Sequence, residues 1–396
     1  MENSEPIQHY RSTLGFKAEV QSDLAGDYHS AIIDWLREHE FQFTSGDTTV
    51  ALAREFGFCY GVDKAVDMAY EALRKFPDRR IFLTTEIIHN PRVNGRLREL
   101  GIRFLSGHYG GDSSYDDLAA GDVVLIPAFG VTTHVEEDLR KRGVILVDTT
   151  CGSVIHVWKR VERYAQDGFT SVIHGKFSHE ETIATASKAG HYLIVRNKQE
   201  AERVCDYIAN GGNRDHFLMH FKNACSEGFE PDFHLHKVGV ANQTTMLSSE
   251  SLEIAGMLRE AFVRKVGPER VEQVFRSFDT ICTATQDRQD AIRALAKTRP
   301  DLFIIVGGYN SSNTSHLAEI AALEDPSYHI DDASCMISAN DIRHLRHPQG
   351  DIVVSKNWLP SGPIRVAFTA GASTPNRVVG EAIARLLELR GITEFP

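Results

Sequence analysis

The sequence predicts an α/β protein with mainly parallel sheets. Short apolar runs rich in β-branched residues alternate along the chain with longer stretches of helical spacing. Several runs end in polar loops that lead into a helix, which is where α/β sheets place ligands. In the clearest case the run 144–147 continues to Cys151 and then to Val154, Val157 and Val161 at helical spacing. A ligand site is therefore expected where such strands end.

The alternation is regular from about residue 46 onward. The runs expected to be strands are 49–53, 81–84, 123–126, 144–147, 171–173, 192–195, 238–241, 274–278, 302–306 and 364–368. The stretches expected to be helices between them are 64–76, 157–165, 249–262, 287–298, 316–323 and 378–389. Segments rich in polar residues and glycine are expected to be surface loops, at 110–114, 210–231 and 348–350.

Residues 1–45 are expected to be an extension that docks on the main body. Ile32, Trp35 and Leu36 share one face of a helix predicted over 27–39. An apolar face of this kind favours packing over a free tail.

Composition excludes several classes of function. The formal net charge of -11 repels nucleic acid, and no basic run with interleaved aromatic residues offsets it. No apolar stretch approaches the roughly 20 residues that a membrane-spanning helix needs. The amino terminus is acidic and lacks a basic segment followed by an apolar one, so we expect a cytoplasmic protein that binds neither nucleic acid nor membrane.

The six cysteines do not pair closely in sequence, which argues against a disulfide scaffold. Cys59, Cys151 and Cys282 each follow a predicted strand, and three such thiols meeting at one point would form a metal site. Burial is the ordinary alternative, because free cysteine is among the most buried residue types. Three thiolates without a fourth ligand suit a 4Fe-4S cluster with one open iron, whereas structural zinc normally takes four ligands. The other three are expected to be structural: Cys205, Cys225 and Cys335.

Five polar loops follow predicted strands, at 87–91, 174–182, 241–245, 307–313 and 369–373. They carry hydroxyls, amides and histidines, and several open a helix, where free backbone N–H groups favour an anion. This content suits a phosphate or diphosphate, although each loop alone could equally be a helix cap. Neither of the common glycine-rich nucleotide-binding motifs is present. No nucleophile elbow surrounds Ser373, so we expect its hydroxyl to donate a hydrogen bond to a phosphate.

Motifs in these loops resemble the 4-hydroxy-3-methylbut-2-enyl diphosphate reductase family, also called LytB or IspH. The motifs occur in the family's order from about residue 50 to 380, and they are specific. The longer amino-terminal part resembles the plant and cyanobacterial branch. The matching segments are 57–62, 86–90, 148–151, 179–181, 243–245, 282–285 with Arg288 and Gln289, 310–313 and 369–373.

The resemblance implies three α/β domains in a trefoil arrangement around a central iron-sulfur cluster. The segments would be an extension over 1–45, a first α/β region over 46–150, a second domain over 151–281 and a third over 282–396 with a carboxy-terminal helix. The first strand and the Cys59 loop are expected to pack with the third domain.

The resemblance also implies the site. Cys59, Cys151 and Cys282 would hold one 4Fe-4S cluster per chain, with one iron not ligated by protein. Glu181 would relay a proton, helped by Thr244. The residues implied to bind the diphosphate substrate are His89, His179, Thr244, Ser311, Ser312, Asn313 and Ser373.

The implied reaction is a two-electron, two-proton reductive dehydroxylation. It converts (E)-4-hydroxy-3-methylbut-2-enyl diphosphate to isopentenyl and dimethylallyl diphosphate, the last step of the methylerythritol phosphate route to isoprenoids. A ferredoxin or flavodoxin would donate single electrons, and the chain would be a monomer or a homodimer.

Two positions depart from the pattern of many bacterial members. Phe129 stands where they carry a diphosphate-binding histidine, for which His134 is a candidate replacement, and Gly152 stands where a proline often follows the second cysteine. Two other functions stay open: a non-catalytic iron-sulfur redox sensor or binding protein of the same fold, and a metal-dependent phosphate-ester hydrolase that uses the His-Glu loop.

Overall fold

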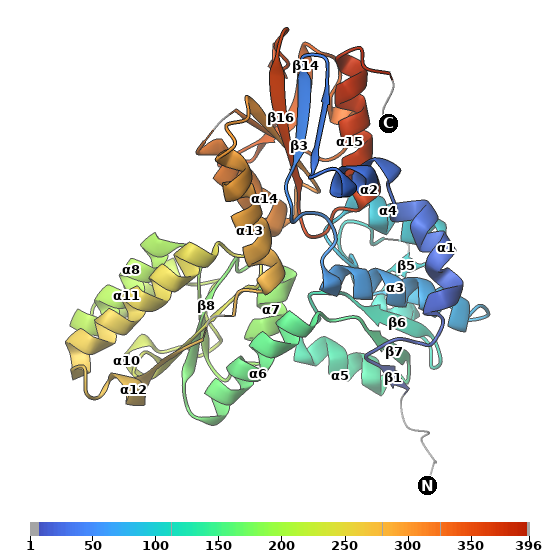
Figure 1. Ribbon diagram of the computed structural model, residues 1–396. Helices are drawn as coiled ribbons and strands as arrows, with labels where there is room; N and C mark the ends of the chain where they lie inside the picture. Colours follow the sequence, from blue (N-terminus) through green and yellow to red (C-terminus); the bar gives the residue numbers. More distant parts are fainter. Residues whose placement is uncertain (1–7, 112, 279, 325, 394–396) are drawn as a thin grey trace. The chain divides into compact units, whose positions relative to one another are not determined.

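The computed structural model describes residues 8–111, 113–278, 280–324 and 326–393, so parts of the predicted extension, of the loop 110–114 and of the last segment lie outside the described residues. The chain forms two compact units: unit 1 contains Met1–Arg11 and Ser114–Cys282, and unit 2 contains Ser12–Ser113 and Thr283–Pro396. Strands and helices alternate in both, and most strand pairs are parallel, which confirms the α/β class (Figure 1). The segment boundaries given above stay a prediction.

Unit 1 contains two sets of parallel strands. In the first, β7 (Ile145–Asp148) lies between β1 (His9–Tyr10) and β6 (Val123–Ile126). The second has the order β11 (Phe275–Ser277), β10 (Val238–Asn242), β8 (Thr170–His174), β9 (Tyr192–Val195). Its longer helices are α5 (Thr133–Lys141), α6 (Gly152–Gln166), α8 (Lys198–Asn210) and α11 (Ser248–Val266). Its shorter helices are η1 (Tyr115–Asp117), α7 (Glu180–Ala186), α9 (Arg214–His220), α10 (Pro231–His234) and α12 (Val271–Val274).

The second sheet of unit 1 is covered on both faces, as its continuous apolar strands require. Val238 and Val240 belong to the core under α8 and α11, whereas Ala241 packs with Val157 and Val161 of α6. Alternate residues of a strand point to opposite faces. Helices α8 and α11 therefore lie on one side of β8, and α6 lies on the other (Figure 1).

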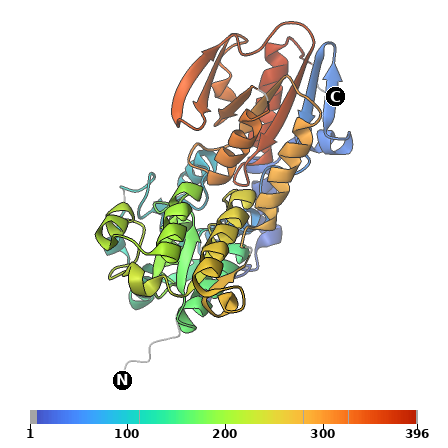
Figure 2. The same cartoon turned by 90° about the vertical axis from the view of Figure 1, so that its left-hand side faces the viewer.

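Unit 2 is built on a seven-stranded sheet of order β15 (Asp351–Lys356), β14 (Asp341–Arg346), β13 (Ser327–Ile330), β12 (Leu302–Val306), β16 (Ile364–Ala370), β3 (Thr48–Leu52), β2 (Gln42–Ser45). Its four central strands are parallel. Antiparallel partners occupy both edges, and Figure 2 shows the orange-red edge and the blue edge at opposite sides. Strands β4 (Ile81–Leu83) and β5 (Arg103–Phe104) also pair in parallel. The helices are α1 (Lys17–Tyr28), α2 (Ala31–Glu38), α3 (Tyr60–Lys75), α4 (Pro91–Glu99), α13 (Thr283–Ala296), α14 (Ser312–Ala322), η2 (Ala333–Cys335) and α15 (Asn376–Leu389).

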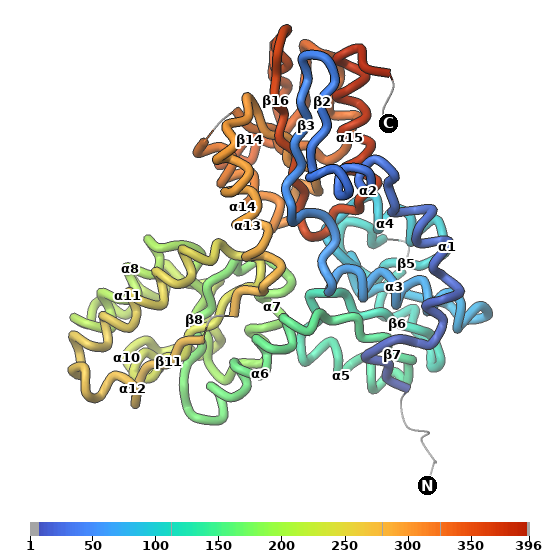
Figure 3. Tube along the Cα trace, in the orientation of Figure 1, coloured from blue at the N-terminus to red at the C-terminus, as the bar shows by residue number. Residues whose placement is uncertain are grey.

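The central strands of this sheet come from opposite ends of the sequence. Strand β3 pairs in parallel with β16 along its whole length, and the blue and red segments run side by side in Figure 3. Strand β3 thus shares a sheet with the last strand of the chain, and the loops that follow the two strands leave the same edge of the sheet.

The amino-terminal extension docks as expected, but its helix prediction is wrong. In place of one helix over 27–39, α1 ends at Tyr28 and α2 begins at Ala31. The Ser30 hydroxyl accepts a hydrogen bond from the Ile33 backbone N–H, which makes Ser30 the N-cap of α2. Ile33 and Leu36 are fully buried in the core of unit 2.

A buried carboxylate fastens the segment before α1. Glu71 of α3 is 1% exposed and accepts hydrogen bonds from the Thr13 hydroxyl and from the backbone N–H groups of Leu14 and Phe16. A buried carboxylate satisfied by three donors fixes the chain path at this point.

Two further expectations are corrected. The segment 210–231, predicted as a loop, contains α9, which Asn213 caps by accepting from the His216 N–H. The predicted strand over 274–278 is shorter, because Val274 belongs to α12. Within the described ranges, no helix combines the length and apolar character that crossing a membrane requires.

Candidate active site

Three cysteines lie directly before helices. Cys59 is the N-cap of α3, Cys151 is the N-cap of α6, and Cys282 immediately precedes α13. All three are partly exposed and free of disulfide bonds. A helix amino terminus stabilises negative charge, so these positions suit thiolates that bind a metal. The remaining cysteines lie elsewhere: Cys205 and Cys335 are buried, and Cys225 forms a β-bridge with Leu193.

The Cys59 loop is fixed by a long-range clamp within unit 2. The Cys59 N–H donates to the carbonyl of Ala372 at 3.3 Å. The buried Arg288 guanidinium donates to the carbonyls of Gly57 at 2.7 Å and Phe58 at 3.2 Å. Gly57 has φ +72°, a conformation that favours glycine. Arg288 therefore holds the backbone that presents the thiol.

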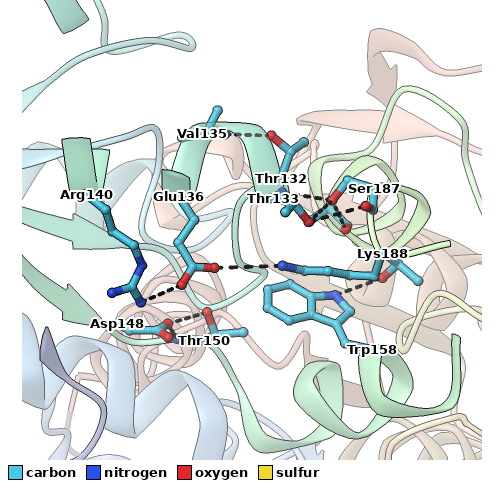
Figure 4. Close-up of polar contacts among 12 residues, drawn as sticks. Thr132, Thr133, Val135, Glu136, Arg140, Asp148, Thr150, Trp158, Ser187 and Lys188 are labelled. Atoms are coloured by element: carbon cyan, nitrogen blue, oxygen red, sulfur yellow. Dashed lines mark hydrogen bonds and ion pairs between the residues drawn. The ribbon is translucent and has the colours of Figure 1, made fainter. Parts of the chain in front are cut away.

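The Cys151 loop is fixed within unit 1. The Cys151 N–H donates to the carbonyl of Ala128 at 2.8 Å, and the Thr149 hydroxyl donates to Ile126 at 2.6 Å. The Asp148 carboxylate accepts from both the backbone and the hydroxyl of Thr150 (Figure 4). Gly152, the departure noted above, is exposed, and among the described residues no atom beyond its own turn of helix lies within 4 Å of where its Cβ would be. Packing therefore does not require glycine there.

Glu181 lies in the first turn of α7 and is 3% exposed. Its Oε1 accepts from the Thr244 N–H at 2.6 Å and its Oε2 accepts from the Thr244 hydroxyl at 3.0 Å. The carbonyl of Thr244 in turn accepts from the Cys282 N–H at 3.5 Å. One residue thus connects the predicted proton relay to a predicted metal ligand.

His179 is the N-cap of α7. Its Nδ1 accepts from the Glu181 N–H at 3.2 Å, so in the neutral ring the proton lies on Nε2. The ring of Phe129 packs edge-on against His179, with centroids 6.4 Å apart. Phe129 cannot donate to an anion, but it contacts a histidine that can. His134 is exposed on α5.

Gln243 is a supporting residue that the predicted site omits, although it begins the motif 243–245. Its Oε1 accepts from the Lys176 N–H and from the Thr182 hydroxyl, each at 3.1 Å. Gly175 packs against it, since a Cβ there would lie 3.1 Å from the Gln243 Cβ. Gln243 therefore joins the loop after β10 to the loop that carries His179.

In unit 2 the structure brings together the other predicted substrate residues. The Ser373 hydroxyl lies 3.1 Å from the carbonyl of His89 and 3.4 Å from the Ser311 hydroxyl. Ser311 caps α14, and Ser312 and Asn313 form its first turn. The Asn313 Oδ1 accepts from the Ala372 N–H at 2.8 Å, and its buried Nδ2 has no hydrogen-bond partner among the residues that the structure describes. A buried amide donor without a partner marks a place for an acceptor from outside the chain.

His89 has a local acidic neighbour. Its Nδ1 lies 3.3 Å from Glu86 Oε2, which also accepts from the Asn310 side chain at 3.0 Å. Gly308 packs closely here, because a Cβ there would lie 2.9 Å from the His89 carbonyl. Glu86 and Asn310 therefore orient His89, and the sequence motifs 86–90 and 310–313 are signals that could have indicated the pair.

A second histidine supports the loop 307–313 and carries no motif in the sequence. His329 on β13 is 1% exposed, and its Nε2 donates to the carbonyl of Gly307 at 2.9 Å. Burial lowers the pKa of His329 to about 3. The neutral ring carries its proton on Nε2, so Nδ1 accepts from His347 Nε2 at 2.9 Å.

His329→Gln is expected to make the free energy of unfolding fall less steeply as pH falls below neutrality. With a pKa of about 3 in the folded state and 6.5 in the unfolded state, the unfolded chain binds the extra proton between these values. The stabilisation is complete above pH 6.5 and is lost as pH falls toward 3, at about 1.4 kcal/mol per pH unit. Scanning calorimetry at about pH 7 and about pH 5.5 should show a smaller fall in midpoint temperature for the variant.

His108→Gln is the matched control, because His108 is an exposed histidine of the same unit. Its midpoint temperature should fall with pH as in the parent. A His329→Gln profile parallel to that of the parent would contradict the assignment of a neutral buried ring.

The fold and these residues fit a metal-dependent α/β enzyme with an anionic substrate. A family model described as LytB protein matches residues 50–387. The chain belongs to the LytB family.

Curated relatives match nearly the whole chain. A 4-hydroxy-3-methylbut-2-enyl diphosphate reductase from Gloeobacter violaceus is 49% identical over 390 residues, covering 98% of this chain and 94% of the relative. The protein of the same name from Thermosynechococcus vestitus is 47% identical over 385 residues, covering 97% and 95%. Identity at this level extends through both units.

Solved structures share the fold. One, described as (E)-4-hydroxy-3-methyl-but-2-enyl diphosphate reductase, the terminal enzyme of the non-mevalonate pathway, is 26% identical with a TM-score of 0.52 and covers 87% of this chain and 100% of its own. The reductase from Plasmodium falciparum has a TM-score of 0.63 at 22% identity, over 87% of this chain and 89% of its own, and supports the fold alone.

Proposed function

We propose that this chain is an enzyme that reduces (E)-4-hydroxy-3-methylbut-2-enyl diphosphate to isopentenyl and dimethylallyl diphosphate, the last step of the methylerythritol phosphate route. The observation that carries the proposal is the 49% identity to a reductase of that name over 98% of the chain. The polar residues around Glu181 and Ser373 supply the chemistry that the reaction needs.

The cofactor proposed is one 4Fe-4S cluster held by Cys59, Cys151 and Cys282. The donor set supports it, because each thiol is partly exposed at a helix start and is not engaged in a disulfide. Bound there, the cluster would supply single electrons and one iron without a protein ligand that accepts the substrate hydroxyl.

The diphosphate is proposed to bind to neutral donors. Ser311, Ser312 and Asn313 open α14, where backbone N–H groups and the helix dipole favour an anion. The unpartnered Nδ2 of Asn313 supports this assignment most directly. The remaining proposed donors are His89, His179, Thr244 and Ser373.

Glu181 is proposed to deliver the proton that makes the hydroxyl a better leaving group. Its burial and its two hydrogen bonds to Thr244 support this role, because they fix both oxygens in one orientation. Thr244 would pass the proton through its hydroxyl, which lies 3.0 Å from Oε2.

The proposal also includes the electron donor, the cellular compartment and the oligomeric state. A ferredoxin or flavodoxin would donate the electrons one at a time, in the cytoplasm, to a monomer or homodimer.

Iron and acid-labile sulfide should be measured on protein purified without oxygen, followed by turnover of the hydroxymethylbutenyl diphosphate with a one-electron reductant. About four of each per chain with formation of both products is the expected result. Iron and sulfide without turnover would favour a non-catalytic iron-sulfur protein. Phosphate release without iron would favour a hydrolase.

A further inference from the structure

Trp158 of α6 contacts three parts of unit 1 that the proposed chemistry needs, and Figure 4 shows its indole beside Lys188. Its indole Nε1 donates to the hydroxyl of Thr185 at 3.2 Å. Thr185 is 2% exposed and lies near the end of α7, the helix that begins with Glu180 and Glu181. The indole therefore binds the far end of the helix whose first turn carries the proposed proton donor.

The Lys188 side chain lies over the same ring. Lys188 follows α7, its side chain is 9% exposed, and its Nζ lies 4.7 Å from the centroid of the Trp158 ring. The same Nζ lies 3.7 Å from the carboxylate of Glu136, which also accepts from Arg140 at 2.8 Å. Burial raises the pKa of Glu136, but the hydrogen bond from Arg140 and the charges of Lys188, Arg140 and Arg11 together leave it below its ordinary value. The contact with Glu136 holds Lys188 against the indole.

The third contact of Trp158 is with the backbone of Gly130. A Cβ at Gly130 would lie 2.3 Å from the indole ring, and Gly130 has φ +79°. Only glycine permits this approach. Gly130 follows Phe129, whose ring packs against His179. The indole thus fixes the loop that supports His179 at the start of α7.

Helix α7 needs such support. It has 7 residues, and isolated helices of this length are not stable in water. A further contact holds its end, because the Thr133 N–H donates to the Ser187 hydroxyl at 3.0 Å (Figure 4).

We propose that Trp158 is a positioning residue that fixes α7 at both ends and so sets the orientation of His179 and Glu181. The significance for catalysis rests on the proposed function, whereas the positioning itself does not. Trp158 contacts Thr185, Lys188 and Gly130. It acts on His179 through Gly130 and Phe129, and on Glu181 through Thr185 and Lys188.

The test is hydrogen exchange on the purified full-length protein carrying Trp158→Leu. The Glu181 N–H bonds to His179 and the Thr244 N–H bonds to Glu181, so both amides report the orientation. We expect both to exchange about tenfold faster in the variant. If Trp158→Leu does not fold, Trp158→Phe removes the donor to Thr185 while keeping an aromatic ring, and it decides the question with the same readout.

Trp358→Leu is the matched control. Trp358 is 2% exposed, and its Nε1 donates to the carbonyl of Ser338 in unit 2, so its loss also removes a buried indole and its hydrogen bond. The Glu181 and Thr244 amides should exchange there as in the parent. Unchanged exchange in the Trp158 variant, or equal acceleration in both variants, would overturn the proposal.

Gly130→Ala tests the same contact by changing the partner of Trp158 in it. Alone, this substitution should accelerate exchange of the Glu181 amide, because the new methyl group collides with the indole. In the double variant with Trp158→Leu the indole is absent, so Gly130→Ala should accelerate exchange by less than it does alone. Full additivity would count against a route through Gly130.

In turnover, Trp158→Leu is expected to lower kcat by about tenfold or more with a smaller change in KM. A parent without turnover would refute the proposed function and leave the exchange result standing.

Discussion

Glu181→Gln should lower kcat by about a thousandfold, because a carboxamide cannot donate the proton that the leaving hydroxyl requires. The substitution keeps the size of the side chain. Its Oε1 can still accept from the Thr244 N–H, and its new NH₂ group can donate to the Thr244 hydroxyl in place of the Oε2 contact. The loss should therefore fall on kcat while KM changes little. Steady-state kinetics with a one-electron reductant measures both.

Glu180→Gln is the matched control for this result. Glu180 occupies the same turn of α7 but is exposed. It should retain the parental kcat and the parental melting temperature. If the two variants lost activity equally, the loss would reflect the charge of the helix start, and Glu181 would not be the proton donor.

Cys151→Ser should remove the bound iron and, with it, all measurable turnover. The hydroxyl of serine is a far weaker ligand for iron than a thiolate, and two remaining thiolates do not hold a 4Fe-4S cluster firmly. Iron per chain is expected to fall from about four to about one or less after anaerobic reconstitution and desalting. The backbone contacts of the loop, such as the Cys151 N–H to Ala128, are unaffected by the change.

Cys225→Ser separates ligand loss from the general effect of removing a thiol. Cys225 is also partly exposed, but it lies in a β-bridge with Leu193 and not at a helix start. Burial raises the pKa of its thiol, which disfavours the metal-binding thiolate. Iron content should match the parent. Retention of four irons in Cys151→Ser would contradict the assigned ligand set.

The sequence predicted the buried strands well because they are fully apolar. The runs 123–126, 192–195 and 302–306 are strands with the predicted bounds. Both faces of these strands are covered, so their hydrophobicity is continuous and needs no tertiary information to be recognised. The parallel fold class follows from their alternation with helices.

Polar strands on one side of the seven-stranded sheet were missed for the opposite reason. Strands β14 and β15 carry polar residues such as Asp341, Arg343 and Asp351, and β15 is exposed or half-buried throughout. Their pairing with the rest of the sheet defines them, and their own composition resembles a loop. Helix starts were also placed too late, because α3 begins at Tyr60 and α6 at Gly152, before the apolar periodicity is visible.

The site was predictable as a set of residues but not as a set of contacts. Motifs indicated Glu181, Thr244 and Asn313, because the resemblance rests on their loops. The bonds that orient them join loops far apart in sequence, as from Glu181 to Thr244, and no local pattern encodes these pairs. Trp158 and His329 act only through such contacts, which is why the sequence indicated neither.

The pairing of β3 with β16 has a consequence for the order in which the chain matures. During synthesis the continuous stretch 114–282 of unit 1 can collapse early, whereas β3 must wait for the strand at 364–370 to leave the ribosome. The N–H of Cys59 likewise bonds to Ala372, so its loop has no fixed shape until the chain is almost finished. Metal loading should accordingly be a late, post-translational event, and chains truncated before β16 should emerge unable to acquire iron.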